Sequence, residues 1–413
     1  MKIIRNKIFI LLFIVSCNNL FAADSPYSKF GIGNILIPQN VISSGRAATG
    51  ISLSSIYYSN RLNPAGLNLI GKTVFSADAY YNGMHIQDTK ANNFLSSFKF
   101  FGFDLTIPLS TSKGITTNLG LIPYSSVDYT IKKNVVIENF SNELEYKGDG
   151  GLSNAYLSAS FNLINELSLG LKLNYIFGNI YHQITQNAGA SKTEIYRVTK
   201  LYNLNGTFGL IYSGLGKLIG LKEAHQINFG FIYSNQFNLN AEVNRYFDFY
   251  FNQRLVTQDT LLMGKSKLQI PAALGFGISY VYNKRYLLTS DIYFQNWSST
   301  QPIVDMDGKF KNNLRYSFGL EIIPYTGKVS QLQRFGYRAG MFYNQSYLRV
   351  NSVDIDELGF TIGTDFPIFG DTRLALGFEY SVRGDKKVQR DKIYKLTIGL
   401  IGTELWFVRP EEE

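Results

Sequence analysis

The side chains that could carry chemistry are few, and their spacing does not assemble a catalytic or metal site. The three histidines, His85, His182 and His225, lie far apart in the sequence. None belongs to a Ser/His/Asp pattern, and no paired metal ligands are present. We therefore expect no catalytic residues, no metal and no cofactor, and a protein that is not an enzyme.

The remaining candidates are charged side chains within otherwise apolar segments, where they share a face with small and polar residues. They are Lys172, Asp291, Arg315, Glu321, Arg338, Asp365, Glu379 and Arg383. A charge that faces lipid at mid-depth costs about 2–4 kcal/mol, so in a membrane-spanning wall these side chains must point inward. Because both signs occur on adjacent segments, we expect most to pair with one another or with a plug. The alternative is a lumen arginine that binds a ligand carboxylate.

The segments that carry these charges alternate large apolar residues with small or polar ones. In residues 167–178 the large face consists of Leu167, Leu169, Leu171, Leu173, Tyr175 and Phe177. A period of two predicts β-strands. Fourteen segments follow it: 72–84, 92–108, 114–132, 152–164, 167–184, 194–213, 224–241, 266–283, 285–297, 313–324, 334–349, 355–368, 371–384 and 392–407.

These strands are long, and the chain is rich in aromatic residues, with 28 Tyr and 31 Phe in 413 residues. Soluble strands usually run to about 5–6 residues. The pattern predicts an all-β fold, a 14-stranded antiparallel transmembrane β-barrel over residues 72–408 with a periplasmic tail at 409–413. The alternative is a large soluble β-sandwich or barrel, whose strands also alternate.

Residues 1–23 have the pattern of a secretory signal peptide, with basic residues before a short apolar run and a cleavage site ending at Ala22. Cys17 is the single cysteine, and its context also resembles a lipoprotein cleavage box; we favour its removal with the leader. Together with the barrel strands, the leader predicts the outer membrane of a Gram-negative bacterium. The net charge of +9 comes without a basic recognition helix, so we expect lipid contact and no nucleic acid.

The connections between the segments alternate in length. Outer-membrane barrels place short turns in the periplasm and long loops outside, which predicts periplasmic termini. The long connections are residues 133–151, 241–265 and 298–312. The second contains an aromatic cluster that we interpret as a surface loop for ligand capture or for docking a partner: Tyr246, Phe247, Phe249, Tyr250 and Phe251.

Residues 24–71 precede the first strand and alternate poorly, with three prolines and six glycines. A 14-stranded barrel leaves a lumen that wall side chains alone do not fill. We therefore predict that this segment is a plug inside the barrel. The alternative is a disordered periplasmic tail, which apolar residues such as Phe30, Ile32 and Leu36 disfavour.

Pro123 interrupts the third predicted strand. Proline cannot donate to a β-ladder, so in a closed barrel it predicts a local break in pairing, which Gly120 makes easier to form. The alternative is a harmless bulge. Near the N-terminus, Asn63-Pro64-Ala65 predicts a turn in which the Asn side chain caps the backbone.

Two N-terminal segments, Gly45-Arg46-Ala47 and Asn63-Pro64-Ala65-Gly66, resemble the hatch of the FadL family of outer-membrane transport proteins. Other short segments are similar too: Leu268-Gln269-Ile270-Pro271, Phe366-Pro367, Gly377-Phe378-Glu379-Tyr380 and Arg383-Gly384.

The resemblance implies a passive channel for hydrophobic small molecules such as long-chain fatty acids. It places gating in Arg46, Asn63, Pro64, Ala65 and Gly66, with a lateral opening at a third-strand kink. The architecture is also similar to PorV-like barrels of the type IX secretion machinery. Docking of a surface or secretion protein is therefore the alternative function.

Overall fold

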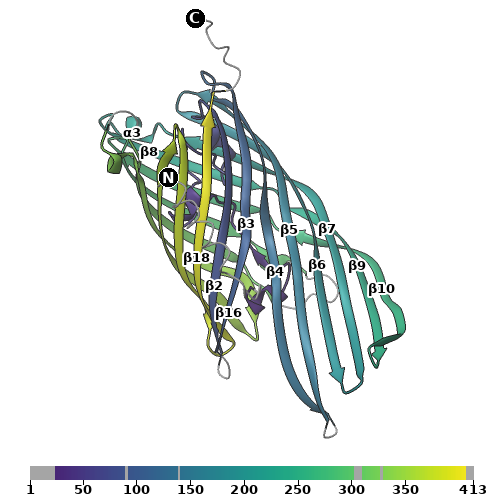
Figure 1. The fold of residues 1–413 in the computed structure, drawn as a ribbon. Coiled ribbons are helices and arrows are strands. Elements are labelled where there is room, and N and C mark those ends of the chain that lie inside the picture. The colour runs from purple at the N-terminus through teal and green to yellow at the C-terminus, as the bar shows by residue number, and fades with distance from the viewer. Residues whose placement is uncertain (1–23, 89–91, 138–139, 302–308, 326–328, 406–413) are drawn as a thin grey trace, which may run out of the picture.

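The computed structural model describes residues 24–88, 92–137, 140–301, 309–325 and 329–405. The predicted leader, the tail 409–413 and residues 302–308 of the connection 298–312 lie outside the described residues. Figure 1 shows a tilted ring of long strands with the N-terminal segment, in purple, inside it.

Fourteen antiparallel strands form the wall, and this number confirms the prediction. Two of the fourteen are interrupted, one at residues 235–236 and the other at Pro271-Ala272, and each therefore carries two labels. The strands are β2 (Thr73–Gln87), β3 (Asn92–Ser110), β4 (Ile115–Ile137), β5 (Phe140–Ile164), β6 (Leu167–Ala188), β7 (Ser191–Tyr212), β8 with β9 (His225–Ser234, Phe237–Phe251), β10 with β11 (Arg254–Ile270, Ala273–Tyr282), β12 (Tyr286–Gln295), β14 (Asn313–Ile322), β15 (Gly336–Val350), β16 (Val353–Phe369), β17 (Thr372–Asp385) and β18 (Gln389–Glu404). Pairing of β18 with β2, from Glu404–Thr73 to Arg390–Gln87, closes the ring.

The alternation in sequence becomes an apolar outside and a polar inside. On β11, Phe276 and Ile278 are exposed, whereas Gly277 and Ser279, which alternate with them, are buried. The same holds around the ring, where exposed Leu, Ile and Phe side chains alternate with buried Asn, Ser, Thr and charged ones. An exposed apolar band around a closed barrel is the surface that lipid covers.

Helical structure is limited to single turns. The described residues contain α2 (Val41–Ser44), α3 (Leu215–Leu218) and the 3-10 turns η1 (Pro26–Lys29), η2 (Pro64–Leu67), η3 (Trp297–Ser299) and η4 (Gln331–Arg334), with two-residue strands β1 (Asn34–Ile35) and β13 (Lys309–Phe310). Within these residues, no helix is long and apolar enough to cross a membrane.

The prediction of long loops at residues 133–151 and 241–265 is wrong, because both stretches are mostly strand. Strand β4 continues to Ile137 and β5 begins at Phe140, and the β9–β10 hairpin turns at Asn252-Gln253. The predictions failed because both faces of these extensions carry polar residues, so the one-sided apolar alternation disappears.

The extensions form one continuous sheet beyond the barrel, which we call the outer sheet. It comprises residues 127–137, 140–151, 179–188, 191–202, 240–251 and 254–267, paired in that order. With 25 residues, β5 reaches about 80 Å, whereas about 9–11 residues suffice to cross a bilayer. Figure 1 shows the outer sheet projecting past the ends of β3 and the yellow strands.

Candidate functional site

The wall is interrupted between β3 and β4. Their ladder runs from Ser110–Ile115 to Phe103–Leu121 and ends there, two residues before Pro123. Beyond that point β3 pairs with β2 alone and β4 with β5, where the register shifts between Pro123 and Ser125. One side of the barrel is therefore not sealed by strand pairing over the half that leads to the outer sheet.

The N-terminal segment covers the unpaired edge of β4. Strand β1 pairs with it, Asn34 opposite Ser126 and Ile35 opposite Ser125, and the Leu36 amide donates to the Tyr124 carbonyl at 2.9 Å. Further along, the Asp24 amide donates to the Asp128 carbonyl at 2.9 Å. These contacts supply the backbone partners that β3 does not.

Lys99 of β3 spans the interruption. Its ammonium lies 3.1 Å from the Asp24 carboxylate and 3.3 Å from that of Asp128 on β4, and donates to the Ser126 hydroxyl at 2.9 Å. This side chain is about one-fifth exposed. A partly hydrated ammonium thus joins β3, β4 and the N-terminal segment.

A cavity of about 230 Å³ lies in the lumen directly behind this interruption. Residues 34–39, including β1, line one side of it. The wall contributes amides and charges, among them Asn82, Asn154, Asn174, Asn205, Asn313, Asn344, Lys172, Arg315, Glu379 and Arg383. Aromatic and aliphatic side chains, including Tyr124, Phe237, Trp297, Phe342 and Ile270, complete the lining. The cavity is therefore mixed in character, with polar groups around an apolar part.

Residues 37–71 of the N-terminal segment, which we call its rear half, are held by buried charged side chains. The Arg61 guanidinium lies 2.7 Å from Asp78 of β2 and 2.7 Å from Asp104 of β3, and all three side chains have zero exposure. Arg61 also donates to the Gln39 carbonyl at 2.9 Å. This cluster ties two parts of the segment to two wall strands.

A second buried cluster lies on the far wall. Arg46 pairs with Glu321 of β14 and donates to the Tyr58 hydroxyl at 2.8 Å. Glu321 also pairs with Arg338 at 2.7 Å, and Arg338 continues the network to Asp365 of β16. Nearby, Asp291 of β12 accepts from the Gly50 amide at 2.7 Å and the Ile51 amide at 3.0 Å.

The Asn63-Pro64-Ala65 turn is seated on wall glycines. Asn63 caps η2, accepting from the Ala65 amide at 3.0 Å, and its own amide donates to the Ile51 carbonyl at 2.6 Å. A Cβ on Gly209 would lie 2.0 Å from Asn63 Oδ1, and one on Gly170 would lie 2.3 Å from the Ala65 amide nitrogen. Only glycine leaves room for the turn to rest this close to β6 and β7, with Gly66 buried beneath it.

The predicted lumen charges all lie in the wall facing the N-terminal segment or the cavity. Six are buried; Arg315 and Arg383 are half-buried. Most have charged partners, such as Glu379 with Lys395 and Arg383 with Asp391. Arg315 differs, because its guanidinium stacks 3.8 Å from the Phe342 ring and donates to the Ala47 carbonyl.

Two predicted sites are placed differently by the structure. Gly120 pairs opposite Asp104 in the intact part of the β3–β4 ladder, and a Cβ there would strike Tyr156, so it is a packing glycine rather than the kink. The aromatic cluster Tyr246, Phe247, Phe249, Tyr250 and Phe251 lies in strand β9 and not in a loop. Tyr246 and Phe247, like Phe249 and Tyr250, are adjacent in the sequence, so their side chains fall on opposite faces of the strand.

Sequence reasoning missed Gly102, Lys99 and the Arg61 cluster. Gly102 has a φ of +142° and faces Ile122 where the ladder ends, with a register shift beside it on β2. An isolated glycine in a strand pattern signals such a bulge, so this position was detectable. Lys99 and Arg61 carry no sequence signal, because their partners are far away in the chain.

Among the described residues, no group of three or more His, Cys, Asp or Glu side chains lies close enough together to hold a metal ion.

A closed 14-stranded wall, an apolar exterior and an N-terminal segment inside the ring define a β-barrel of FadL-like fold. Known structures agree with this class. The Ralstonia pickettii toluene transporter TbuX is 14% identical, with a TM-score of 0.59 over 90% of this chain and 98% of that one. A Pseudomonas aeruginosa FadL homologue is 13% identical, with a TM-score of 0.59 over 90% and 99%. The Pseudomonas putida toluene transporter TodX is 16% identical, with a TM-score of 0.56 over 89% and 98%.

At these identities the likeness is one of fold. No curated protein matches the sequence. A family profile described as BamG matches residues 3–411, and the chain therefore belongs to the BamG family.

Proposed function

We propose that this protein is an outer-membrane channel for small amphipathic molecules, in which residues 24–71 act as a hatch. A molecule reaches the lumen cavity from the side of the outer sheet and leaves sideways between β3 and β4. The observation that carries the proposal is the position of β1, which both covers the unpaired edge of β4 and lines the cavity. Displacing this one short strand would connect the cavity with the wall interruption.

The cavity sets the class of ligand. Its volume of about 230 Å³ lies below the 300–1,000 Å³ of typical small-molecule sites, so a long acyl chain does not fit without expansion. The amide groups need hydrogen-bond partners, which a pure hydrocarbon does not supply. A compact molecule with an apolar body and one hydroxyl or carboxylate satisfies both parts of the lining. Arg315, which has no ion pair among the described contacts, is our candidate for the polar end.

The interruption in the wall explains how passage avoids a water-filled pore. An unpaired backbone group in lipid costs several kcal/mol, so the edge of β4 requires a partner whenever it faces the bilayer. The hatch provides that partner in the closed state. In the open state, ligand and water at the gap would take its place.

A reversible crosslink tests this gate. Asn34 and Ser126 are register partners, and paired strands bring Cα atoms to the 4.5–5.5 Å that a disulfide spans. In a Cys17→Ser background, Asn34→Cys with Ser126→Cys would lock β1 to β4. The control pair is Thr116→Cys with Ser160→Cys, which joins two wall strands that stay paired in either state.

We would measure uptake of radiolabelled 4-methylphenol and of toluene by a porin-deficient Gram-negative host. The expected result is that oxidation of the Asn34/Ser126 pair slows uptake of 4-methylphenol at least tenfold and that a reductant restores it. The control pair should have no effect, and 4-methylphenol should be preferred over toluene. Unchanged uptake with β1 locked would overturn the proposal.

Binding can be followed separately from transport. Trp297 is buried and lines the cavity, so in a Trp406→Phe background it is the single tryptophan reporter. Quenching of its fluorescence by 4-methylphenol, lost in Arg315→Met, would support the assigned ligand site. A second candidate function is the docking of another protein. The observation that favours it is the unpaired edge of the outer sheet.

A further inference from the structure

Strand β10 is paired on one side only. Its residues Arg254–Ile270 pair with β9 throughout, whereas β11, its continuation in the barrel wall, pairs with both β8 and β12. Strand β12 ends at Gln295 opposite Ala273, so it does not continue alongside β10. Among the described residues, the second edge of β10 therefore has no strand beside it. Figure 1 shows β10 as the last strand of the outer sheet.

This edge is also open on both faces. Every residue from 254 to 265 is exposed, and the exposed set includes large apolar side chains. Met263 is 67% exposed, Val256 59% and Leu255 50%. Exposed apolar side chains on an unpaired edge form a template for another strand.

Strand β9, which pairs with β10, is itself paired on both sides. Strand β9 pairs with β10 on one side and with β7 over residues 191–202 on the other. Tyr246 of β9 stacks on Tyr196 of β7 with ring centroids 5.0 Å apart. The β10 backbone is therefore held in an extended form before any partner arrives, which lowers the conformational entropy lost on binding.

Two irregularities limit which part of the edge can pair. The register with β9 shifts between Leu255 and Thr257 and again between Thr260 and Leu262. Bulges of this kind disrupt continuous pairing and are a usual protection of edge strands. From Leu262 to Ile270 the register is regular, and within it Leu262–Lys267 is the accessible stretch.

We propose that residues Leu262–Lys267 bind an extended segment of another protein, which adds to the outer sheet as an extra strand. Backbone hydrogen bonds would supply the affinity, and side-chain neighbours would supply the specificity. The stretch carries Lys265 and Lys267 with no acidic residue, beside Leu262 and Met263. The occupant is therefore a segment with acidic residues next to apolar ones. This inference does not depend on the channel function.

A second copy of this chain fits less well. An antiparallel copy centred on Ser266 would place Lys265 of one molecule opposite Lys267 of the other. Like charges directly opposite each other in a sheet are destabilising. In that register the lysines act against self-pairing, whereas an acidic segment places opposite charges beside them.

The test uses the full-length protein in its own outer membrane. A photo-crosslinking amino acid, p-benzoylphenylalanine, replaces Leu261, and the adduct is mapped by mass spectrometry of the linked peptides. Met263→Pro and Gly264→Pro each remove one backbone donor. Because successive amides point to opposite sides of a strand, one variant breaks the β9 ladder and the other removes a donor from the free edge. The variant that keeps the melting temperature is the one that reports on docking.

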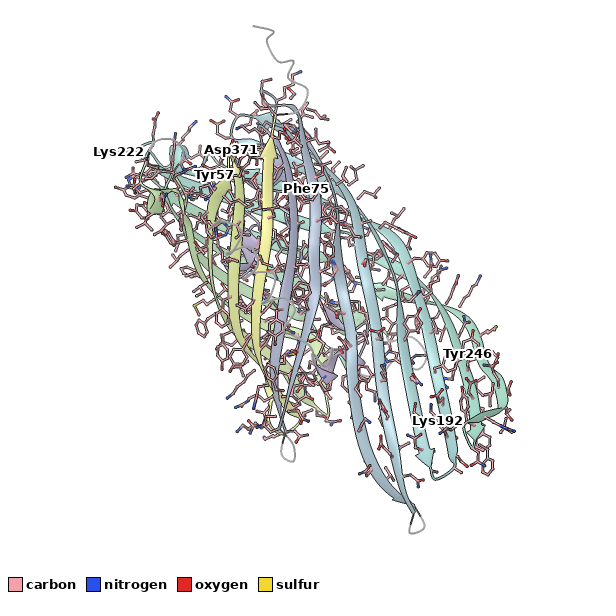
Figure 2. The ribbon with its side chains drawn as sticks, in the orientation of Figure 1. Tyr57, Phe75, Lys192, Lys222, Tyr246 and Asp371 are labelled. Carbon is pink, nitrogen blue, oxygen red and sulfur yellow. The ribbon has the colours of Figure 1, made fainter. Side chains whose placement is uncertain are left out.

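We expect an adduct with one acidic segment of another protein, reduced at least tenfold by the free-edge proline. Lys265→Glu with Lys267→Glu should reduce it similarly. Lys222→Glu, an exposed lysine at the opposite end of the barrel, should leave it unchanged (Figure 2). No adduct, an adduct with a second copy or with residues of the same chain, or an adduct insensitive to the free-edge proline would overturn the proposal.

Discussion

Replacing Arg61 by methionine should release the rear of the hatch. Arg61 is fully buried between Asp78 and Asp104 at 2.7 Å from each. Removing one partner of a buried ion pair is destabilising by about 3–5 kcal/mol, because it leaves an uncompensated charge. Here two carboxylates would face each other without their cation. At about 1.4 kcal/mol per factor of ten, the population of released hatch should rise between a hundredfold and several thousandfold.

Limited trypsin digestion of the folded barrel in detergent measures this population. Cleavage of a transiently opened segment follows its equilibrium population when opening and closing are fast. Lys29 and Arg46 supply cleavage sites within the hatch, and loss of residues 24–46 identifies the product. Heat-modifiable migration on a gel shows in parallel that the barrel itself stays folded.

Two controls isolate the effect of burial. Lys72 forms an exposed pair with Asp371, at 45% and 62% side-chain exposure, so Lys72→Met should change the digestion rate less than tenfold. Combining Arg61→Met with Asp78→Asn and Asp104→Asn removes the stranded charges and should recover most of the protection. A rise of less than tenfold in Arg61→Met, or no recovery in the triple variant, would refute this account of how the hatch is held.

Three further predictions use matched variants. Gly209→Ala should lower the free energy of unfolding by about 1–3 kcal/mol, because its Cβ would meet Asn63 and Pro64. Gly402→Ala, with open space around it, should leave the free energy of unfolding unchanged, and thermal melting measures both variants. Lys99→Met should speed cleavage at Lys29 without exposing Arg46, because it removes the cation shared by Asp24 and Asp128 but leaves the Arg61 cluster intact; cleavage at both sites together would contradict it. If the outer sheet faces the cell exterior, an impermeant thiol reagent should label Met263→Cys and spare Lys222→Cys on intact cells, and the reverse pattern would invert the topology.

Strand count was predictable because lipid and lumen impose opposite demands on alternate residues. The alternation of Phe276 and Ile278 with Gly277 and Ser279 carries this signal within one segment. It failed in the extensions of β9 and β10, where both faces carry polar residues and neither face is wholly apolar. The sequence pattern therefore predicted a loop at Asp248 and Tyr250, although both residues continue the ladder with β7.

The position of the hatch contacts could not be predicted, for a different reason. Arg61 and Asp104 are 43 residues apart, and each is an ordinary polar residue in its own segment. Their pairing depends on where the segment crosses the lumen, which only the assembled ring determines. The interruption after Leu121 was partly predictable, since Pro123 marks it, but the glycine opposite it, Gly102, was not recognised.

The two halves of the hatch differ in how strongly they are held, and this difference assigns an order to movement in the proposed channel. The rear half is fixed by buried ions at Arg46 and Arg61, each of which would leave stranded charge if it moved. The front half, residues 24–36, is held by hydrogen bonds, by the apolar packing of Tyr27 and Ile32, and by Lys99, whose ammonium is partly hydrated already. Breaking hydrogen bonds that water can replace costs about 0.5–1.5 kcal/mol each, well below the cost of a stranded charge. The front half should therefore leave the edge of β4 first, and the gap between β3 and β4 can open while the rear half still closes the lumen.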